Sequence, residues 1–432
     1  MGHAAPMSSL SWHTPLFAAL LAAACGRSPL PEPNELPTTP DNTGGEPFSM
    51  TLSLDGVPAG SRLTLTRLPT ASPADESTTL LPESQSALTL EAPAHEILFA
   101  VITSPDGKVI HTQSMAASCK RGGNERVLRV PQDFPTLQAG IDAASAGDTV
   151  KVAPGTYFEH VRLGRGICLL GSGAASTVLD GQGAGETLVD MTDAKGSVLA
   201  GFTLRGVGLA SGCSRPEDPF LCSGNWYAAA VNLDGHSWAE PPEGGIFVVD
   251  GDGFTDPVVS PPALVTHNVF EGNQIALMVY YHGVVIARNN VFVGNELAFI
   301  ANHFQDRTLI ANNVFWENRR IAIGSSAAYL DIVNNVIARS ETAVVHQFMQ
   351  TGRIRCNLFF ENASVGERVP VGTDGNVVVD PKFRNPGSGD FHLSPGSPGI
   401  DKGCFRGAAF DPDGSDEDLG IYGGPLGDWT QG

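Results

Sequence analysis

The stretch IANNVFWEN, residues 310–318, decides the fold, because variants of it recur along the chain. The variants read VTHNVFEGN at 265–273, IARNNVFVGN at 286–295, IVNNVIARS at 332–340 and IRCNLFFEN at 354–362. The Asn before the apolar pair falls at steps of 22, 23, 22 and 22 residues, at Asn268, Asn290, Asn313, Asn335 and Asn357. A spacing that holds over four steps indicates a repeat protein of the solenoid type.

Each repeat contains three short apolar runs, as in NVFWEN, IAIGSSA and YLDIVNN of the third copy. A unit of about 22 residues is too short for a helix pair, and it lacks the Leu spacing of leucine-rich repeats. Three short strands per coil fit, with the coils stacked in parallel at about 4.8 Å. The sequence therefore predicts an all-β fold, a parallel β-helix.

The recurring Asn is interpreted as structural. At one turn of every coil its side-chain amide can bond to the amides above and below, which makes an Asn ladder. Asn also tolerates the left-handed backbone that a corner often needs. We therefore expect these asparagines to form a spine of the fold and not a site.

The repeats, together with FPTLQAGIDAASAGDTVKVAPGTYFEHV (134–161), resemble the right-handed parallel β-helix proteins of the pectate-lyase-like superfamily. The resemblance implies a coil over 131–432, with a helix at 136–146 covering its N-terminal end and a capping tail at 369–432. It leaves the activity open, because the superfamily contains lyases, hydrolases, esterases, epimerases and proteins with no known reaction.

One segment interrupts the repeats. Gly201-Phe202-Thr203 occupies the place of an earlier ladder phrase, and Gly201 lies 67 residues before Asn268, which is close to three coils of about 22. Residues 207–243 read as an insertion that holds one or two coils and a long loop, and a disulfide between Cys213 and Cys222 would close that loop.

The part of the chain before the coil divides into three. Residues 1–24 include nine apolar residues, LFAALLAAA, which fit a signal peptide and are far short of a membrane span. Residues 25–46 read as a Pro-rich tether. Residues 47–130 alternate short apolar runs with turn signals and predict a small antiparallel, sandwich-like β domain.

The segment that runs into Cys25 resembles a bacterial lipobox, whose Cys becomes lipidated. This resemblance implies an extracytoplasmic protein anchored to a bacterial membrane, the outer membrane in this prediction. The alternative is an ordinary cleaved signal and a secreted protein.

The net charge of −20 argues against nucleic acid or an anionic membrane surface as the main partner. We expect a monomer that touches a membrane only through its N-terminal lipid and binds a polysaccharide or another surface glycan.

The candidate site is a polar cluster that recurs eight to eleven residues before most ladder asparagines. Because one offset on a solenoid means one face, the cluster should form a stripe, with aromatic rings for sugar faces and Arg for carboxylates. A solvated face is the alternative. The predicted substrate-binding residues are Tyr281, His282, Asn302 and Gln347, and Tyr280, Ser325 and Ser326 belong to the same stripe.

Catalysis at this stripe is left open. Elimination from a uronate needs a base and a cation, and hydrolysis needs two carboxylates. Only Asp306 and Asp331 lie near enough to serve as carboxylates. If the protein is an enzyme, we expect a polysaccharide lyase or glycoside hydrolase; the rival from another class is a non-catalytic, adhesin-like surface protein. The catalytic candidates are His303, Asp306, Arg307, His346 and Arg353.

The tail segment DPDGSDED, residues 411–418, has the oxygen density of a calcium loop. Asp411, Asp413 and Asp418 are the candidate ligands, and such an ion would lock the C-terminal end. An acidic solvated loop is the alternative.

Overall fold

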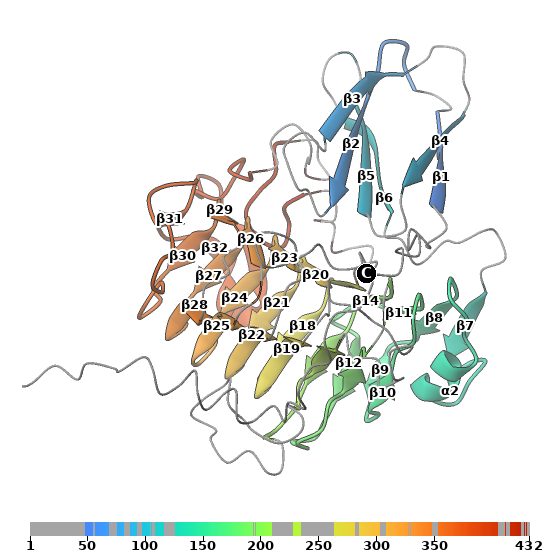
Figure 1. Cartoon of the computed structure of the whole chain (residues 1–432), viewed down its shortest axis with the longest axis vertical. Helices are drawn as coiled ribbons and strands as arrows, with labels where there is room; N and C mark the ends of the chain where they lie inside the picture. The colour runs from blue at the N-terminus through green and yellow to red at the C-terminus, as the bar shows by residue number, and fades with distance from the viewer. Residues whose placement is uncertain are drawn as a thin grey trace, which may run out of the picture. The chain divides into compact units, whose positions relative to one another are not determined.

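The computed structural model describes residues 48–54, 57–68, 76–81, 87–92, 97–103, 105, 109–115, 126–192, 194, 196–209, 228–234, 263–280, 285–302, 308–326, 328, 330–347, 353–404, 411, 415–424, 427 and 429. Figure 1 shows them as two kinds of β structure, one antiparallel and one coiled. Within these ranges, no helix has the length and apolar character that a membrane span requires.

The antiparallel part confirms the prediction that a small antiparallel β domain precedes the coil. One pair joins two of its strands and a four-stranded sheet joins the other four, with Leu63 and Ile102 in a small apolar core. The pair is β1 (Phe48–Ser53) with β4 (Ala87–Ala92), and the sheet runs β3 (Glu76–Leu80), β2 (Arg62–Leu68), β5 (Ile97–Thr103), β6 (Val109–Met115).

The coiled part is a right-handed parallel β-helix, as predicted. Successive strands enter three sheets in turn, and each strand pairs in parallel with its equivalents in the coils before and after it. Sheet 1 runs β10 (Val161–Arg162), β13 (Val189–Asp190), β16 (Val231–Asp234), β19 (Ile275–Tyr280), β22 (Leu297–Asn302), β25 (Ile321–Ser326), β28 (Thr342–Gln347). Sheet 2 runs β7 (Val127–Val130), β8 (Thr149–Val152), β11 (Cys168–Leu170), β14 (Val198–Ala200), β17 (Ala263–Thr266), β20 (Val285–Arg288), β23 (Thr308–Ala311), β26 (Leu330–Val333), β29 (Ile354–Arg355). Sheet 3 runs β9 (Gly155–Tyr157), β12 (Thr177–Asp180), β15 (Thr203–Arg205), β18 (Val269–Glu271), β21 (Val291–Val293), β24 (Val314–Trp316), β27 (Val336–Ala338), β30 (Leu358–Phe360), β31 (Val377–Val378).

The interior of the coil is filled by columns of identical or similar side chains. Phe270, Phe292 and Phe315 stack with centroid distances of 4.7 and 4.6 Å and nearly parallel rings. This spacing equals the strand spacing of about 4.8 Å, so the repeat itself brings the rings into contact.

The Asn ladder lies where it was predicted, between sheets 2 and 3, and its five members are fully buried. The Oδ1 atom of Asn290 accepts hydrogen bonds from the backbone N–H and the Nδ2 of Asn268, at 3.1 and 3.3 Å. The same pattern repeats through the following coils and ends at Asn376. Each step therefore satisfies polar groups that the core would otherwise leave unpaired.

A second ladder, which was not predicted, lies between sheets 3 and 1. Asn273, Asn295 and Asn318 repeat the same bonds with one another. The ladder breaks at Ser340 and resumes where the Ser340 N–H donates to Oδ1 of Asn362, at 3.0 Å.

The left-handed backbone conformation was predicted at the ladder asparagines, and this assignment is wrong by one residue. The residue before each one takes that conformation, with φ between 51° and 58°; these residues are His267, Asn289, Asn312, Asn334 and Cys356. The ladder residue follows this corner and so turns its amide into the stack.

The interval before Asn268 holds one coil, within the one or two coils expected and not the three that its length alone would allow. β14 pairs directly with β17, and the Phe202 N–H donates to Oδ1 of Asn268 at 3.1 Å. The 66 residues between these two ladder positions therefore make a single coil. This coil contains two long connections between strands. Residues 210–227 of the first and residues 235–262 of the second lie outside the described residues.

The N-terminal end of the coil is covered by helix α2 (Leu137–Asp142), which is shorter than the expected 136–146. Thr136 caps it by accepting the Ala139 N–H at 3.2 Å, and Leu137 and Ile141 are buried in the main core. Gly140 permits the close approach, since a Cβ there would lie 2.9 Å from Val130 Cγ2.

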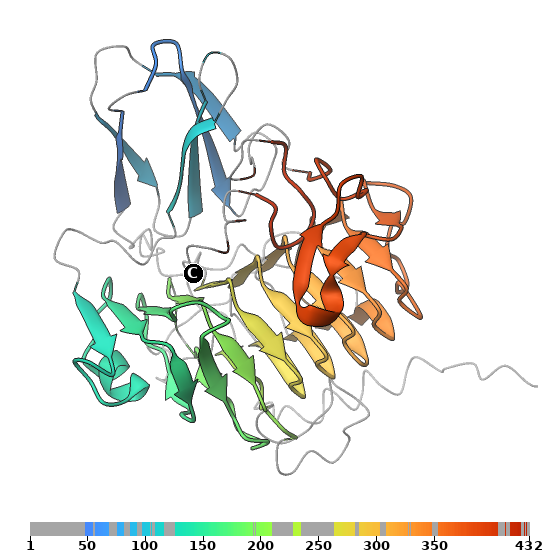
Figure 2. The same ribbon diagram turned by 180° about the vertical axis from the view of Figure 1, so that it is seen from behind.

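The tail packs against the outside of the coil. Strands β32 (Phe383–Asn385) and β33 (Asp390–Leu393) form an antiparallel hairpin around the short 3-10 helix η2 (Pro386–Ser388), and Phe383 and Phe391 meet Trp316 of sheet 3 edge to face. Figure 2 shows this hairpin, in red, in front of the orange strands.

The rest of the tail follows the column of left-handed corners from coil to coil. Every corner residue meets it: Cys356 by a disulfide to Cys404, Asn334 by bonds to Cys404, Glu417 and Gly420, Asn312 by a bond to Asp418, Asn289 by bonds to Ile421 and Gly423, and His267 by a ring contact with Trp429. The tail thus ties successive coils together.

Candidate functional site

The predicted polar stripe lies at the ends of four neighbouring strands of sheet 1. Tyr280, Asn302, Ser326 and Gln347 share one register position in β19, β22, β25 and β28. Because the strands are parallel and in register, these four positions stack directly above one another. Each is the last residue of its strand, so the column runs along the edge of sheet 1 where the chain turns toward sheet 2.

The surface beside this column is apolar and closed. Met278, Ile300 and Ile321 belong to a cluster on the other side of sheet 1 from the main core, and none is more than 9% exposed. Ser326, at the strand end, is 8% exposed. Among the described residues of this outer column, the polar ones stand at the strand ends.

His346 belongs to a different column. It pairs in register with Ser325, which is 2% exposed and follows Ala301 in the interior column. Within the described part of the chain, neither ring nitrogen of His346 has a hydrogen-bond partner. Burial and the charge of Arg368 lower the pKa of His346, so the ring is neutral at neutral pH. The structure thus separates His346 from the outer column.

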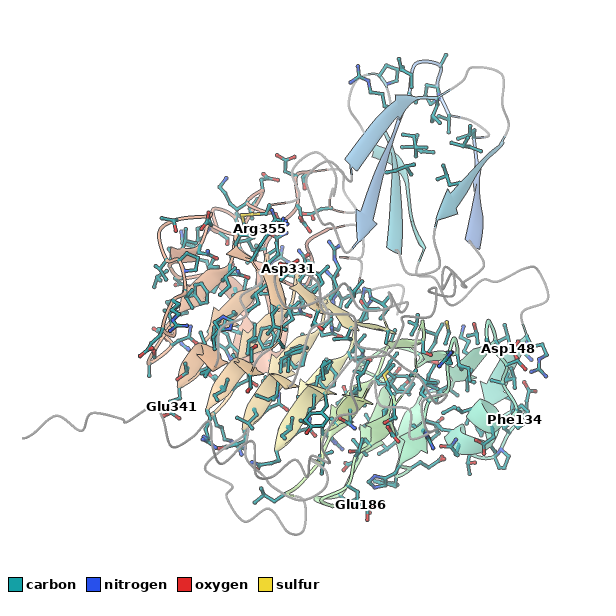
Figure 3. All side chains as sticks on the ribbon, in the orientation of Figure 1. Phe134, Asp148, Glu186, Asp331, Glu341 and Arg355 are labelled. Atoms are coloured by element: carbon teal, nitrogen blue, oxygen red, sulfur yellow. A yellow bond between two sulfur atoms is a disulfide. The ribbon has the colours of Figure 1, made fainter. Side chains whose placement is uncertain are left out.

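Arg353 lies where the last coil enters sheet 2. Its backbone N–H donates to Oδ1 of Asp331 at 2.9 Å, and Arg355 follows two residues later. Figure 3 labels Asp331 and Arg355. Burial and the charge of Arg353 lower the pKa of Arg355. The Asp331 carboxylate is thus engaged by a backbone amide beside two guanidinium groups.

Several predicted residues lie outside the described ranges. They are Tyr281, His282, His303, Asp306 and Arg307 of the stripe, Asp413 of the tail, Cys25, and the pair Cys213 and Cys222. Their roles, and the Cys213–Cys222 disulfide, stay predictions.

The tail carboxylates form part of a buried charged network. Asp411 accepts the N–H groups of Asp418 and Gly424, at 3.0 and 2.6 Å from its oxygens. Burial and the negative charge of Asp418 raise the pKa of Asp411 to about 9. Nearby, Glu417 pairs with Arg288. Calcium binding by Asp411 and Asp418 stays a prediction.

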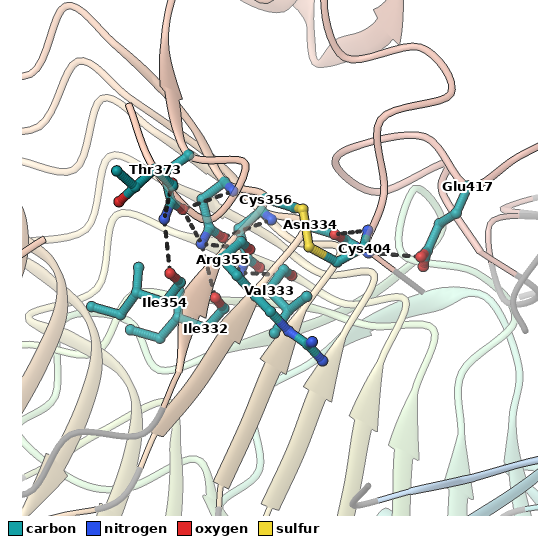
Figure 4. Close-up of a disulfide and its surroundings, with 12 residues drawn as sticks. Ile332, Val333, Asn334, Ile354, Arg355, Cys356, Thr373, Cys404 and Glu417 are labelled. Atoms are coloured by element: carbon teal, nitrogen blue, oxygen red, sulfur yellow. Dashed lines mark hydrogen bonds between the residues drawn. A yellow bond between two sulfur atoms is a disulfide. The ribbon is translucent and has the colours of Figure 1, made fainter. Parts of the chain in front are cut away.

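The structure adds a disulfide that was not predicted, between Cys356 and Cys404, with Cα atoms 5.7 Å apart (Figure 4). Cys168 is disulfide-bonded as well. The sequence signal was only the even number of cysteines left after Cys25, which does not fix their pairing.

In the described ranges, no three His, Cys, Asp or Glu side chains gather closely enough to hold a metal ion.

Residues 258–389, less than half of the chain, match the sequence model of NosD, described as a periplasmic copper-binding protein.

Solved structures similar to this chain include three polysaccharide enzymes. A GH87 α-1,3-glucanase from Streptomyces thermodiastaticus has a TM-score of 0.35 and 12% identity, over 76% of this chain and 67% of its own. An alginate lyase of the PL6 family has a TM-score of 0.29 and 13% identity, over 59% of this chain, which spans only 40% of that lyase. A pectin methylesterase from carrot has a TM-score of 0.25 and 12% identity, over 61% of this chain and 91% of its own.

No curated protein matches the sequence. The similarities to solved structures are distant, and the fold rests on the strand pairing of this chain itself. This protein is a parallel β-helix.

Proposed function

We propose that the protein binds an extended extracellular or cell-wall polysaccharide along the edge of sheet 1. The observation that carries the proposal is the shared register position of Tyr280, Asn302, Ser326 and Gln347 in four consecutive coils. An aromatic ring can stack on a sugar face, and amides and hydroxyls both donate and accept bonds to sugar hydroxyls.

A polymer fits this column better than a small ligand does. The column repeats at the strand spacing of about 4.8 Å, and it is linear because the coils are stacked in register. A chain of repeating units can meet equivalent groups in successive coils, whereas a small ligand would meet only one or two of them.

Recognition is favoured over cleavage. His346, a candidate base, belongs to the interior column, and Asp331, a candidate carboxylate, accepts the Arg353 amide. Glycoside hydrolysis needs two carboxylates about 5–9 Å apart on either side of the bond, and elimination needs an accessible base. Any cleavage would therefore depend on His303, Asp306 and Arg307, which lie outside the described residues.

An extracytoplasmic location is part of the proposal. The matched family is described as periplasmic, and the chain contains disulfides, which persist in oxidising compartments. Lipidation at Cys25 is proposed with it. The test is the membrane fraction of a bacterial host, from which Cys25→Ser should release the protein.

The function itself is tested by affinity electrophoresis of the full chain through gels that contain neutral or uronate polysaccharides, with and without Ca²⁺. We expect one polysaccharide to retard the protein and Asn302→Ala or Gln347→Ala to weaken the retardation. Glu271→Ala is the matched control, because Glu271 is the exposed last residue of β18 in sheet 3.

Reducing ends and unsaturated products are followed in the same samples. Retardation without product would support binding alone, and product would make the protein an enzyme. If no polysaccharide retards the chain and none is cleaved, the glycan proposal fails and a structural or adhesin-like role takes its place.

A further inference from the structure

The polar column of sheet 1 extends one coil further toward the N-terminal end of the β-helix. β16 pairs in parallel with β19, and this pairing places Asp234 in register with Tyr280. Each of the two is the last residue of its strand. Leu233 is 3% exposed and belongs to the main core, so alternation along the strand assigns the Asp234 position to the outer face. The column therefore ends in an acidic residue, one strand spacing of about 4.8 Å from an aromatic one.

The outer face of sheet 1 changes from apolar to polar at the same place. Met278 is 1% exposed, and its partner in β16 is the partly exposed Asn232. Asn232 is in register with Asp190 of β13. The Asp190 side chain is 38% exposed, and its Oδ1 accepts the hydroxyl and the N–H of Thr192, at 2.6 and 2.9 Å. A ligand that lies along the column thus meets polar, partly acidic surface beside Tyr280.

The charged residues of sheet 1 are few and lie at this end alone. The seven strands of the sheet contain Arg162, Asp190 and Asp234, and no Lys or Glu. Arg162 is in register with Asp190, and its Nε lies 3.9 Å from Oδ2 of Asp190. One guanidinium therefore stands against two carboxylates. The other four strands, β19, β22, β25 and β28, contain no Arg, Lys, Asp or Glu.

We propose that the polysaccharide bound along this column is neutral and that Asp234 is the residue that sets this specificity. The specificity rests on the glycan binding proposed above and narrows its substrate class. The Asp234 carboxylate accepts hydrogen bonds from hydroxyls of a sugar whose ring stacks on Tyr280. An ionised acceptor makes the stronger bond to a hydroxyl, whereas the carboxylate of a uronate in the same place meets a like charge.

A polyuronate finds no cationic partner along the strands of the column. Each of its sugars carries a carboxylate, whose charge Arg, Lys or a bound cation must offset. Arg355 lies in β29 of sheet 2, on another face of the coil. A neutral polymer needs only groups that exchange hydrogen bonds with hydroxyls, and Asn302, Ser326 and Gln347 are of this kind. The composition of the column therefore favours a neutral sugar chain.

The first test uses the parent alone. The full chain is run in affinity gels with the polysaccharide panel described above, to which each uronate polymer, polygalacturonate and alginate among them, is added in a neutral form made by reduction of its carboxyl groups. We expect neutral polymers to retard the protein and uronate polymers not to, in EDTA and in Ca²⁺ alike. Stronger retardation by a uronate polymer, or by one in Ca²⁺ alone, would overturn this specificity and leave binding along the column standing. If no polymer of the panel retards the parent, the specificity falls with the glycan proposal.

Variants at Asp234 test whether this residue sets the preference. Asp234→Asn should weaken retardation by the neutral polymer about five-fold, which is the difference between a charged and a neutral acceptor. Asp234→Glu should restore most of it, and Asp234→Lys should allow a uronate polymer to retard the chain. Glu271→Gln is the matched control, because it removes one negative charge from the exposed last residue of β18 in sheet 3. It should bind like the parent.

The control separates a local effect from that of the net charge. Equal changes in Asp234→Asn and Glu271→Gln would assign the preference to the net charge of the chain and overturn the role of Asp234. This comparison stands even if Asp234→Lys fails to fold, since each of the two variants replaces a carboxylate by an amide of similar size. A preference unchanged in every Asp234 variant, while Asn302→Ala weakens binding, would show that the column binds a glycan that Asp234 does not select.

Discussion

Arg288 and Glu417 form an ion pair with 2.8 Å between Nη2 and Oε1, although 129 residues separate them in the chain. Their side chains are 1% and 0% exposed. Glu417 also accepts the Nδ2 of Asn334 at 2.7 Å, so one carboxylate of the tail holds two coils. The pair lies where the tail crosses sheet 2, and it joins the end of the chain to the middle of the repeat.

Removal of one partner should destabilise the protein strongly. We expect Glu417→Gln to lower the free energy of unfolding by about 3–5 kcal/mol, because it removes the carboxylate that pairs with the buried Arg288 charge. Urea unfolding measures the change. The double variant Arg288→Met with Glu417→Leu is the comparison. It should recover part of the loss because both members of the buried ion pair are gone, while the Asn334 Nδ2 still loses its acceptor. An unchanged midpoint for Glu417→Gln would contradict the prediction.

Ser340 is the defect in the second ladder, and its replacement should stabilise the protein. Ser340 is 3% exposed, and its hydroxyl has no partner among the described residues. In Ser340→Asn, Oδ1 could accept the bonds that Asn318 offers to the next coil, as Asn318 accepts those of Asn295. We expect a gain of about 1 kcal/mol in the free energy of unfolding.

The reverse change serves as the control for Ser340→Asn. Asn295→Ser should cost about 1–3 kcal/mol, because it leaves buried amide groups of Asn273 unsatisfied. If Ser340→Asn destabilises the protein while Asn295→Ser does so as expected, the site at Ser340 is too tight for the larger side chain.

The ladders show which parts of this fold can be predicted from sequence. The first could be predicted because a polar residue recurs at a fixed step inside an apolar pattern. The second ladder has the same sequence signal, because most copies of the repeat end in Asn. It was missed because Ser340 replaces Asn in one copy, and because Gly or a charged residue precedes the position. The left-handed corner was assigned one residue late, since the sequence shows the repeat and not the backbone angle.

The tail and the long coil could not be predicted in the same way. The contact of Arg288 with Glu417 joins segments that share no repeat, so no spacing points to it. The interval between Phe202 and Asn268 fits a multiple of the repeat, although insertions fill it. In the candidate site, the shared register of Tyr280, Asn302 and Gln347 could be predicted, because these residues occupy one offset in the repeat. The inward position of His346 did not, because one residue along a strand changes the face.

Asp411 should make stability depend on pH. Its pKa is raised from 3.8 to about 9 by burial and by the charges of Asp418 and Glu417. The folded state therefore keeps a proton that the unfolded chain loses near pH 4. The stabilisation is full below about pH 4 and is lost as the pH rises toward 9.

The measurement is urea unfolding of the parent and Asp411→Asn at pH 5 and pH 8. Asn stays neutral and can still accept the amides of Asp418 and Gly424, so the variant should lose less stability than the parent between the two pH values. The lowered pKa of His346 acts in the opposite direction, with stability gained as the pH rises through about 6.5, so the readout is the difference between the two proteins. Parallel pH profiles would show that Asp411 is ionised in the folded state.

The disulfide between Cys356 and Cys404 should contribute more to the free energy of unfolding than the packing around it does. It joins the last left-handed corner to the tail across 48 residues of chain. In the chain-entropy account, a loop of this length constrains the unfolded state by about 4 kcal/mol. Cys404→Ser should therefore lower the urea midpoint, and Cys356→Ser should lower it by a similar amount. A reductant is a poorer test, because Cys168 is also disulfide-bonded. If both variants unfold at the parent's urea concentration, the tail is held by Arg288, Asn334 and its apolar contacts, and the disulfide adds nothing to them.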